Sequence, residues 1–551
     1  MTVAAWNPEG ASEGTRLATN GFAEPVFLSN TNPARPPVSF ATLAGMSVRK
    51  SVWFAFIVLG FVSTTTAADV VVVCPRALEI ALQPWLADRR ARSLDVAVVR
   101  PRDTPEEQKA TIDAHVDDAT RTILLVGDAP VYGQVRQAGE VPTFERPTTV
   151  TAKFNSTRTL ATDLPYAGVR VGRIAVGRLP VRSTEELAVV VSKILASDHS
   201  DDFGPWRGRV ELVGGVGGFG MLIDATIESI ARTIVTTSLP PSSRTGVLYG
   251  SPGHRFYPRG VFFRDAVTRR YNDGCRFWVY AGHGQVTALD HVPSLNGAAP
   301  PGPPVLDAAS VEALDRSDGA QSIALLLACF NGAVDAPPRC FAEAMLIDPG
   351  GPIAVIAGSR VTMPYGNSKL AMALVESVYR DRAETLGAAW ASTTGRMVAP
   401  EKSDGAGAVD GLLDAVATMM HGEMATADAE RIEHASLYGL LGDPTMRLHP
   451  PREADIATRG SVSTGGGWKL VVSSPIGGRA TVTLDRPLGA AGGGGDPNAT
   501  TVWQSESVVV KDEDLTVLVD GSFLPGWYVA RVHVAGTGQW ATGGTKVFVR
   551  E

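Results

Sequence analysis

The chain has 551 residues, of which 19% are charged, and its formal net charge is -7. A chain of this length exceeds what one hydrophobic core usually organises, so we expect about two to four domains. Because Lys and Arg are scattered along the sequence, the charge pattern argues against a nucleic-acid partner and against a polybasic membrane patch.

The N-terminal region predicts export. Residues 1–45 are rich in Pro, Asn, Ser and Thr and lack periodicity, which indicates a disordered or mis-assigned extension. Residues 46–68 follow the pattern of a secretory signal peptide: the charges of MSVRK, the apolar run SVWFAFIVLGFV, and small residues for cleavage near Ala67 or Ala68. The apolar run is shorter than the ~20 residues that cross a bilayer, so a membrane anchor is the weaker interpretation. We expect translation from Met46 and a secreted, periplasmic or cell-surface protein without stable membrane insertion after signal removal.

Apolar runs alternate with amphipathic stretches from residue 69 to residue 205. The runs DVVVVC, LDVAVVR and TILLVGDA predict strands, and the segments between them predict helices. Strands and helices that take turns imply parallel pairing with helices on both faces. Thr104, with acidic residues behind it, and Ser183 or Thr184 are typical of helix starts. This region predicts a first doubly wound α/β subdomain.

A second α/β subdomain is predicted over residues 206–450. Its strands RVELVGG, CRFWVYAGHG, SIALLLACFNG and PIAVIAGS are almost wholly apolar, as central strands covered on both faces should be. Functional residues in such sheets collect at strand ends. The region ends near LLGDPTMRLHP, in which Asp443 before Pro444 is interpreted as a turn former.

The texture changes over residues 451–551. Short alternating runs such as RATVTLDR and GWYVARVHVAG are separated by Gly-rich turns and have hardly any helical period. This pattern predicts a small antiparallel β-sandwich.

Two of the predicted strands carry the candidate chemistry. LLLACFNG, residues 325–332, leads into Cys329 and an Asn-Gly turn, and FWVYAGHGQ leads into His283 between two glycines. A catalytic cysteine attacks as thiolate, so it needs a neighbouring imidazole and an exposed position. If the two strands are neighbours, His283 can take up the thiol proton and return it to the leaving amine. The N–H groups of Gly284 and Cys329 could then hold the oxyanion.

Other interpretations of these residues stay open. Cys329 could be core filler or a disulfide partner of Cys74, Cys275 or Cys340, since export favours disulfides. Its position at a strand end does not decide between these roles and that of a nucleophile.

A glycine-rich stretch offers a different function. Gly215, Gly217 and Gly220 form the G-x-G-x-x-G pattern of dinucleotide-binding loops, which would suit a nucleotide-dependent oxidoreductase. The acidic residue expected about twenty positions later is missing, so this alternative is the lesser one. No Cys and His spacing is typical of structural zinc.

Several motifs of the chain, taken together, resemble those of a known protein family. YAGHG, followed after a spacer by LLLACFNG, resembles the His-Gly and Ala-Cys pair of the caspase-like cysteine peptidases. ACFNGAVDAPPRCFAEAML is similar to the stretch after the catalytic cysteine in the gingipain family. Further matches keep their order: TILLVGDA, TDLPYA, GRIAVGRLPVRSTEEL, GPIAVIAGS and YGLLGDPTMRLHP. The resemblance covers roughly residues 69–450 and implies caspase-like doubly wound sheets in two tandem α/β subdomains. Gingipains carry an immunoglobulin-like domain directly afterwards, which implies the same for residues 451–551.

The resemblance also implies roles for residues. Cys329 matches the nucleophile, His283 matches the base, and Cys340 matches a second cysteine that is not catalytic. The implied activity is that of a cysteine endopeptidase that cleaves protein or peptide substrates through an acyl-enzyme and needs no cofactor. Asp163 matches a family acidic position, to which we assign no chemistry.

The chain departs from the family in VELVGGVGGFGMLIDATIESI. Gingipains place there an acidic residue that orients the histidine and, further on, an aspartate for the basic side chain before the cleaved bond. This chain has only Asp224 before the helix proper, so Asp224 is a tentative match to either role. It is equally well an acidic residue in a helix's first turn. A preference for basic residues therefore depends on Asp224, and the main alternative is a non-catalytic secreted adhesion or binding module that kept the scaffold.

Overall fold

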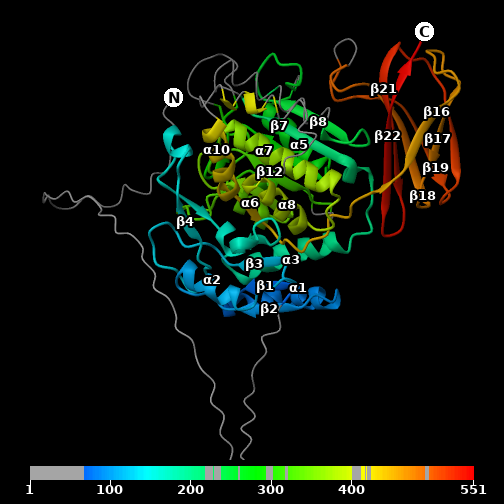
Figure 1. The fold of residues 1–551 in the computed structure, drawn as a ribbon. Helices are drawn as coiled ribbons and strands as arrows, with labels where there is room; N and C mark the ends of the chain where they lie inside the picture. Colours follow the sequence, from blue (N-terminus) through cyan, green and yellow to red (C-terminus); the bar gives the residue numbers. More distant parts are fainter. Residues whose placement is uncertain are drawn as a thin grey trace, which may run out of the picture. The chain divides into compact units, whose positions relative to one another are not determined.

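A computed structural model describes most of the chain after residue 67 (Figure 1). The described residues are 68–216, 228, 238–258, 261–292, 302–316, 320–399, 411, 413–415, 417–418, 424–490 and 495–551. The predicted extension 1–45 and, apart from Ala68, the predicted signal segment 46–68 lie outside them. In the described part of the chain, no helix has both the length and the apolar character needed to cross a bilayer.

The centre of the α/β region is one ten-stranded sheet. Its order is β2-β1-β3-β6-β14-β13-β12-β9-β7-β8. The strands are β1 Val70–Val73, β2 Val96–Val99, β3 Thr122–Val126, β6 Ala175–Leu179, β7 Arg209–Gly214, β8 Arg244–Tyr249, β9 Phe277–Ala281, β12 Ile323–Leu327, β13 Ala354–Gly358 and β14 Tyr438–Leu441. The apolar strands β1, β3 and β13 are fully buried and β12 is buried except at its last residue, because helices cover both faces.

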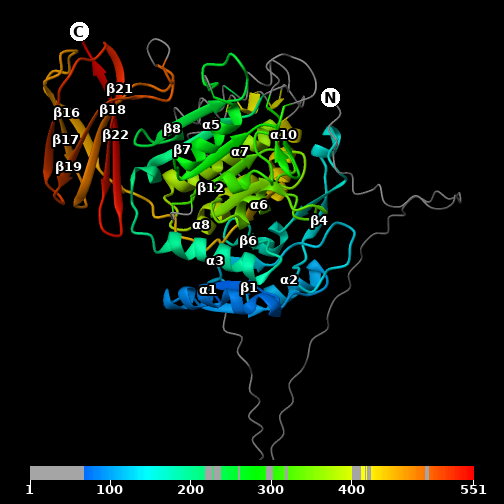
Figure 2. The same ribbon diagram turned by 180° about the vertical axis from the view of Figure 1, so that it is seen from behind.

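Helices flank the sheet on both sides, as Figures 1 and 2 show. They are α1 Glu79–Ala91, α2 Pro105–Asp113, α3 Thr184–Asp198, α5 Phe263–Asn272, α6 Phe341–Ile347, α7 Pro364–Val375, α8 Leu386–Val398 and α10 Met424–Leu437. Residues of α1, α3, α5 and α6 share one core cluster with alternate strand residues such as Leu326. Residues of α7, α8 and α10 form a second core cluster with strand residues that point to the opposite face of the sheet, such as Leu325. The period of two along each strand thus divides the core into two layers.

Two predicted helix starts are confirmed. The Thr104 side chain accepts a hydrogen bond from the Glu107 N–H at the start of α2. The Ser183 side chain accepts one from the Glu186 N–H at the start of α3. Each cap satisfies a peptide N–H that has no partner within the helix.

The arrangement of the sheets corrects the sequence interpretation. We expected separate doubly wound sheets in tandem subdomains 69–205 and 206–450, but strands of both regions form a single sheet. The joining strand is β14, which lies between β13 and β6 and pairs with both, through Leu441 and Arg178 on the β6 side. Because a strand exposes hydrogen-bonding groups along two edges, β14 can pair with a strand of each region and so connect the strands of both regions in one sheet.

The region after residue 450 contains two further sheets with a common core. One has the order β15-β22-β21-β18-β19 and the other β16-β17-β20. Apolar residues of both, including Trp468 and Val482, form one buried cluster. The strands are β15 Arg452–Glu453, β16 Asp455–Arg459, β17 Trp468–Ser473, β18 Gly478–Asp485, β19 Thr501–Val509, β20 Asp514–Val519, β21 Gly526–Ala535 and β22 Trp540–Val549. An immunoglobulin-like topology stays a prediction.

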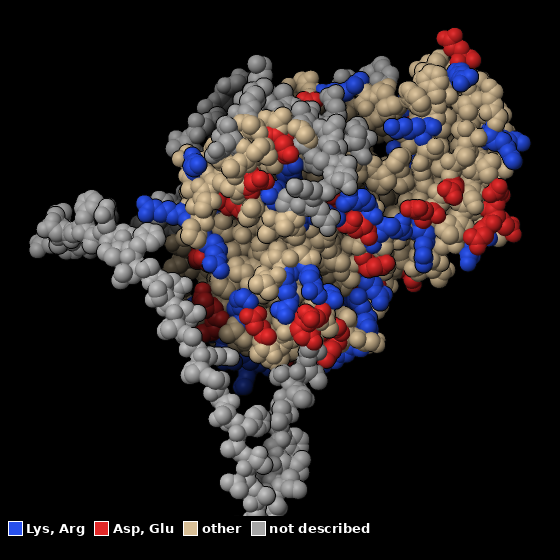
Figure 3. All heavy atoms as spheres, viewed as in Figure 1, with Lys and Arg blue, Asp and Glu red and all other residues tan. Residues whose placement is uncertain are grey.

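Charges on the surface are mixed. On the face drawn in Figure 3, basic and acidic side chains are interspersed, without an extended field of one sign. This matches the scattered charges of the sequence.

Candidate active site

The strands that precede His283 and Cys329 are neighbours. β9 and β12 pair in parallel, with Ala281 opposite Leu327, and the Gly282 N–H donates to the Leu327 carbonyl oxygen at 3.3 Å. His283 and Cys329 each follow this matched pair by two residues. The structure therefore brings both positions to the same edge of the sheet, where parallel strands end.

Cys329 differs from the other cysteines in its environment. All four thiols are free, so the structure does not have the disulfides that export made plausible. Cys329 is half-buried, whereas Cys74, Cys275 and Cys340 are fully buried. Burial raises the pKa of Cys74 and of Cys275 to about 12 and raises the pKa of Cys340 well above its usual value. Among the four, Cys329 is the cysteine that keeps some exposure to solvent.

The backbone turns sharply directly after the thiol. Phe330 has a φ of 60°, which L-residues other than Asn, Asp and Gly seldom adopt. The Phe330 N–H donates to the Arg360 carbonyl oxygen at 3.1 Å, and the Gly332 N–H donates to Gly358 at 2.8 Å. These bonds attach the turn to the end of β13, and they hold Cys329 just beyond the C-terminal end of β12.

The thiol itself contacts Thr362. The Thr362 peptide N–H donates to the Cys329 Sγ at 3.3 Å, and the Thr362 hydroxyl oxygen lies 3.8 Å from the same sulfur. Burial raises the pKa of the Cys329 thiol, while both hydrogen bonds from Thr362 oppose that rise. Such bonds favour the charged form of the sulfur.

The turn that carries His283 is fastened to the turn that carries Cys329. The Asn331 amide nitrogen donates to the carbonyl oxygens of Gln285 at 2.6 Å and of Ala288 at 3.0 Å. Gln285 and Ala288 belong to a small hairpin of β10 (Gly284–Gln285) and β11 (Ala288–Leu289). A Cβ added at Gly284 would lie 2.5 Å from the Cys329 carbonyl oxygen. Only glycine permits this close approach of the two turns.

Tyr280 fixes the histidine turn from the other side. Its hydroxyl donates to the His283 carbonyl oxygen at 2.9 Å. A Cβ at Gly282 would lie 2.7 Å from that hydroxyl, and one at Gly215 would lie 2.8 Å from it. Gly215, the first glycine of the dinucleotide-like pattern, is thus accounted for by packing against Tyr280. Gly217 and Gly220 lie outside the described residues.

Asp224, which the family resemblance matches to the orienting or the pocket aspartate, also lies outside the described residues. The oxyanion roles of the Gly284 and Cys329 N–H groups stay predictions.

Sequence reasoning missed Thr362, Asn331 and Tyr280. Thr362 follows an apolar strand by a few residues, and this position at the edge of the sheet is the signal that could have indicated it.

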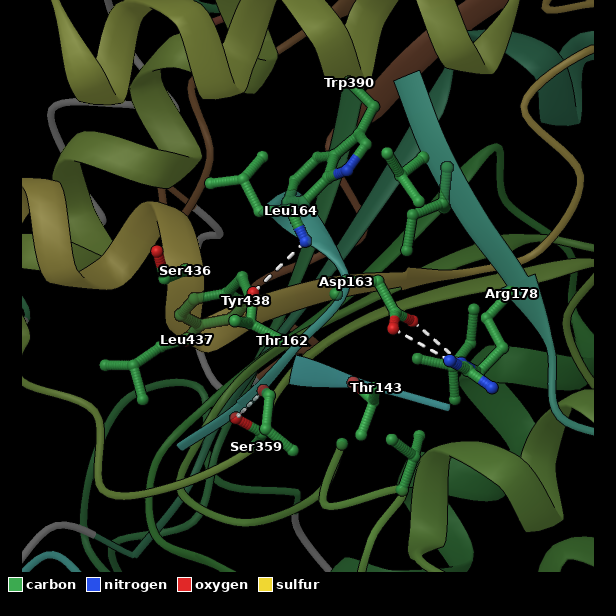
Figure 4. Close-up of a pocket in the computed structure, with 17 residues that line it drawn as sticks. Thr143, Thr162, Asp163, Leu164, Arg178, Ser359, Trp390, Ser436, Leu437 and Tyr438 are labelled. Atoms are coloured by element: carbon green, nitrogen blue, oxygen red, sulfur yellow. Dashed lines mark hydrogen bonds and ion pairs between the residues drawn. The ribbon is translucent and has the colours of Figure 1, made fainter. Parts of the chain in front are cut away.

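A cavity lies behind the nucleophile's turn (Figure 4). Gly332 and Val334 line it, whereas Cys329 and His283 do not. In the cavity wall the Asp163 carboxylate accepts from Arg178 Nε at 2.7 Å and from Nη2 at 2.8 Å, which gives Asp163 a structural role as a counterion. Asp443, predicted as a turn former, is fully buried and pairs with Arg89 at 2.7 Å.

We searched the described residues for clusters of side chains that could bind a metal ion. Among them, no group of three or more His, Cys, Asp and Glu side chains could hold a metal ion.

Comparisons with known proteins give a family and a fold. The model of peptidase family C25 matches residues 63–449. No curated protein matches the chain. The crystal structure of the Arg-specific cysteine proteinase gingipain R (RgpB) is similar with a TM-score of 0.51 at 17% identity, covering 88% of this chain and 98% of that chain. The complex of Porphyromonas gingivalis RgpB pro- and mature domains gives a TM-score of 0.48 at 16% identity, covering 87% and 100%. At such identity the first likeness shows the fold alone.

Proposed function

The chain belongs to peptidase family C25, and on that premise we propose that it is a cysteine endopeptidase with Cys329 as nucleophile and His283 as base. One observation carries the assignment of these two residues. The strands β9 and β12 pair in register, and two residues after their last matched pair come His283 and Cys329, the one cysteine that is not fully buried.

The proposed reaction uses the chain's own groups at each step. His283 takes the thiol proton, and the Cys329 thiolate attacks the carbonyl carbon of the scissile peptide bond. The N–H groups of Gly284 and Cys329 stabilise the oxyanion of the tetrahedral intermediate. The imidazolium then gives its proton to the leaving amine, which leaves an acyl-enzyme that water hydrolyses with His283 again as base.

Substrate preference is a separate part of the proposal. A basic residue before the cleaved bond is expected if the Asp224 carboxylate faces that side chain, and this rests on the family resemblance. The proposed organisation is a signal peptide at 46–68, α/β regions 69–205 and 206–450 that share one sheet, and an immunoglobulin-like domain at 451–551. The enzyme would act after secretion, in a periplasm or at a cell surface.

Hydrolysis of a fluorogenic peptide library by the purified chain tests the proposal. Cys329→Ala is expected to abolish cleavage. Cys74→Ala is the matched control, because Cys74 also follows a strand end but is fully buried, and it should retain cleavage. Asp224→Asn should reduce cleavage after basic residues selectively. If parent and Cys329→Ala proteins both lack activity while a surface partner binds, the chain is instead the adhesion or binding module.

A further inference from the structure

The sulfur of Cys329 is contacted by a residue outside the proposed dyad. Thr362 contacts it with its peptide N–H at 3.3 Å and with its hydroxyl and carbonyl oxygens, each at 3.8 Å. Thr362 is buried and lies just before α7, whose first residue is Pro364. The contact therefore comes from the positive end of a helix dipole, which favours a thiolate.

The direction of the Thr362 hydroxyl is set by its neighbours. The Asn367 amide nitrogen donates to the Thr362 Oγ1 at 3.2 Å. Because that oxygen accepts a hydrogen bond from Asn367, its own hydrogen remains available to point toward the Cys329 sulfur.

The orientation of the Asn367 amide is set in turn by Tyr438. The Tyr438 hydroxyl donates to the Asn367 Oδ1 at 2.7 Å, so the amide nitrogen faces Thr362. Tyr438 is almost completely buried at the start of β14; removal from water raises its pKa more than a hydrogen bond with the Thr362 side chain lowers it, so the hydroxyl keeps its proton. The Tyr438 and Asn367 donors of this chain of hydrogen bonds both point toward Thr362, and aligned hydrogen bonds polarise one another.

We propose that the relay Tyr438–Asn367–Thr362 stabilises the thiolate form of the nucleophile. Thr362 acts as a catalytic residue because it touches the reacting sulfur, while Asn367 and Tyr438 are positioning residues that act through it. The proposal rests on the proposed function, since it assigns the relay to the nucleophile of that reaction. It gives the half-buried thiol a stabilising partner that His283 alone does not provide.

The relay is tested by the rate of Cys329 alkylation with iodoacetamide as a function of pH, which needs no substrate. Only the thiolate reacts, so the midpoint of the rate profile reports the pKa of the thiol. Thr362→Val removes the hydroxyl but keeps the peptide N–H and the side-chain shape. It should move the midpoint upward by about one pH unit and slow alkylation at neutral pH about tenfold. Thr362→Ser restores the hydroxyl and should restore the midpoint.

Asn367→Asp gives a second, independent variant. A carboxylate still accepts from Tyr438 but cannot donate to Thr362, so the threonine hydroxyl turns to donate to the carboxylate instead of the sulfur. The midpoint should rise at least as far as in Thr362→Val. Thr393→Val is the matched control, because Thr393 is a fully buried threonine in α8 whose hydroxyl donates to Ala389, and it should leave the midpoint unchanged.

The outcomes separate the relay from the dyad. An unchanged midpoint in folded Thr362→Val and Asn367→Asp proteins, as judged by near-ultraviolet circular dichroism, overturns the relay. If His283→Ala alone raises the midpoint, the dyad stands without the relay. If the Cys329 thiol of the parent protein alkylates no faster than free cysteine at any pH and neither the relay variants nor His283→Ala change the profile, both assignments fail.

Discussion

Gly366 in α7 offers a sharp test of how the turn before that helix is held. The Met363 N–H donates to His434 Nε2 at 2.8 Å, and the Gly366 N–H donates to Glu430 Oε1 at 2.7 Å. A Cβ at Gly366 would lie 2.2 Å from the Cγ of His434, a distance that real Cβ atoms essentially never show. Gly366→Ala must therefore push the imidazole of α10 away from the Met363 N–H.

The size of the effect follows from three opposing contributions. Alanine in a helix is favoured over glycine by about 1 kcal/mol. Overpacking costs about 1–3 kcal/mol, and a buried N–H without a partner costs about 1–3 kcal/mol. The expected result for Gly366→Ala is a net decrease of about 3 kcal/mol in the free energy of unfolding. Slower alkylation of Cys329 should accompany it, since Thr362 directly precedes Met363.

Gly411→Ala is the matched control. Gly411 is a helical glycine with open space where its Cβ would stand, so the same substitution should increase the free energy of unfolding by about 1 kcal/mol. Urea unfolding curves of both variants measure the difference. A stabilising Gly366→Ala, with the same sign as Gly411→Ala, would refute the reasoning.

Three further substitutions test buried groups around the site. Burial and the neighbouring Asp128 raise the pKa of Glu343 well above its usual value, so the fold holds a proton that the unfolded chain releases above about pH 4.5. Stability is therefore lost as pH rises, and Glu343→Gln should lose less between about pH 5 and about pH 8 in thermal unfolding. Asp335→Asn neutralises a buried carboxylate that pairs with the fully buried Arg360 and should cost about 3 kcal/mol in urea unfolding; a cost below about 1 kcal/mol would contradict the pairing. Burial lowers the pKa of His434, so its stabilising contribution is lost as pH falls below about 6.5; His434→Gln should retain more of its stability in acid than the parent, and equal losses would count against a neutral imidazole there.

Much of the fold follows from local patterns in the sequence. The apolar runs before Cys329 and His283 predicted buried strands, and the chain has them at those positions as β12 and β9. Ser183 and Thr104 cap helices as their side chains and positions indicated. These features depend on neighbours in sequence, which a periodicity argument can use.

Features that depend on distant residues were not predicted. The union of the strands in one sheet depends on the pairing of Leu441 with Arg178, and periodicity does not reveal which edge a strand will join. Thr362 donates a hydrogen bond to the sulfur of Cys329, and Asn331 donates one to the carbonyl oxygen of Gln285. Each pair is separated by more than thirty residues in the sequence, so a local pattern does not reveal it. Asp443 forms the predicted turn, since its carboxylate accepts from the Thr445 N–H at 2.8 Å, but its buried partners Trp85 and Arg89 were not predicted because they come from the first helix.

The most direct test of the central claim is active-site labelling with a peptidyl acyloxymethyl ketone that carries a basic residue next to the warhead, followed by peptide mass spectrometry. The account predicts one adduct, on Cys329, that is absent in Cys329→Ala and forms much more slowly in His283→Ala. An adduct on Cys74, Cys275 or Cys340, or an unchanged labelling rate in folded His283→Ala, would contradict it.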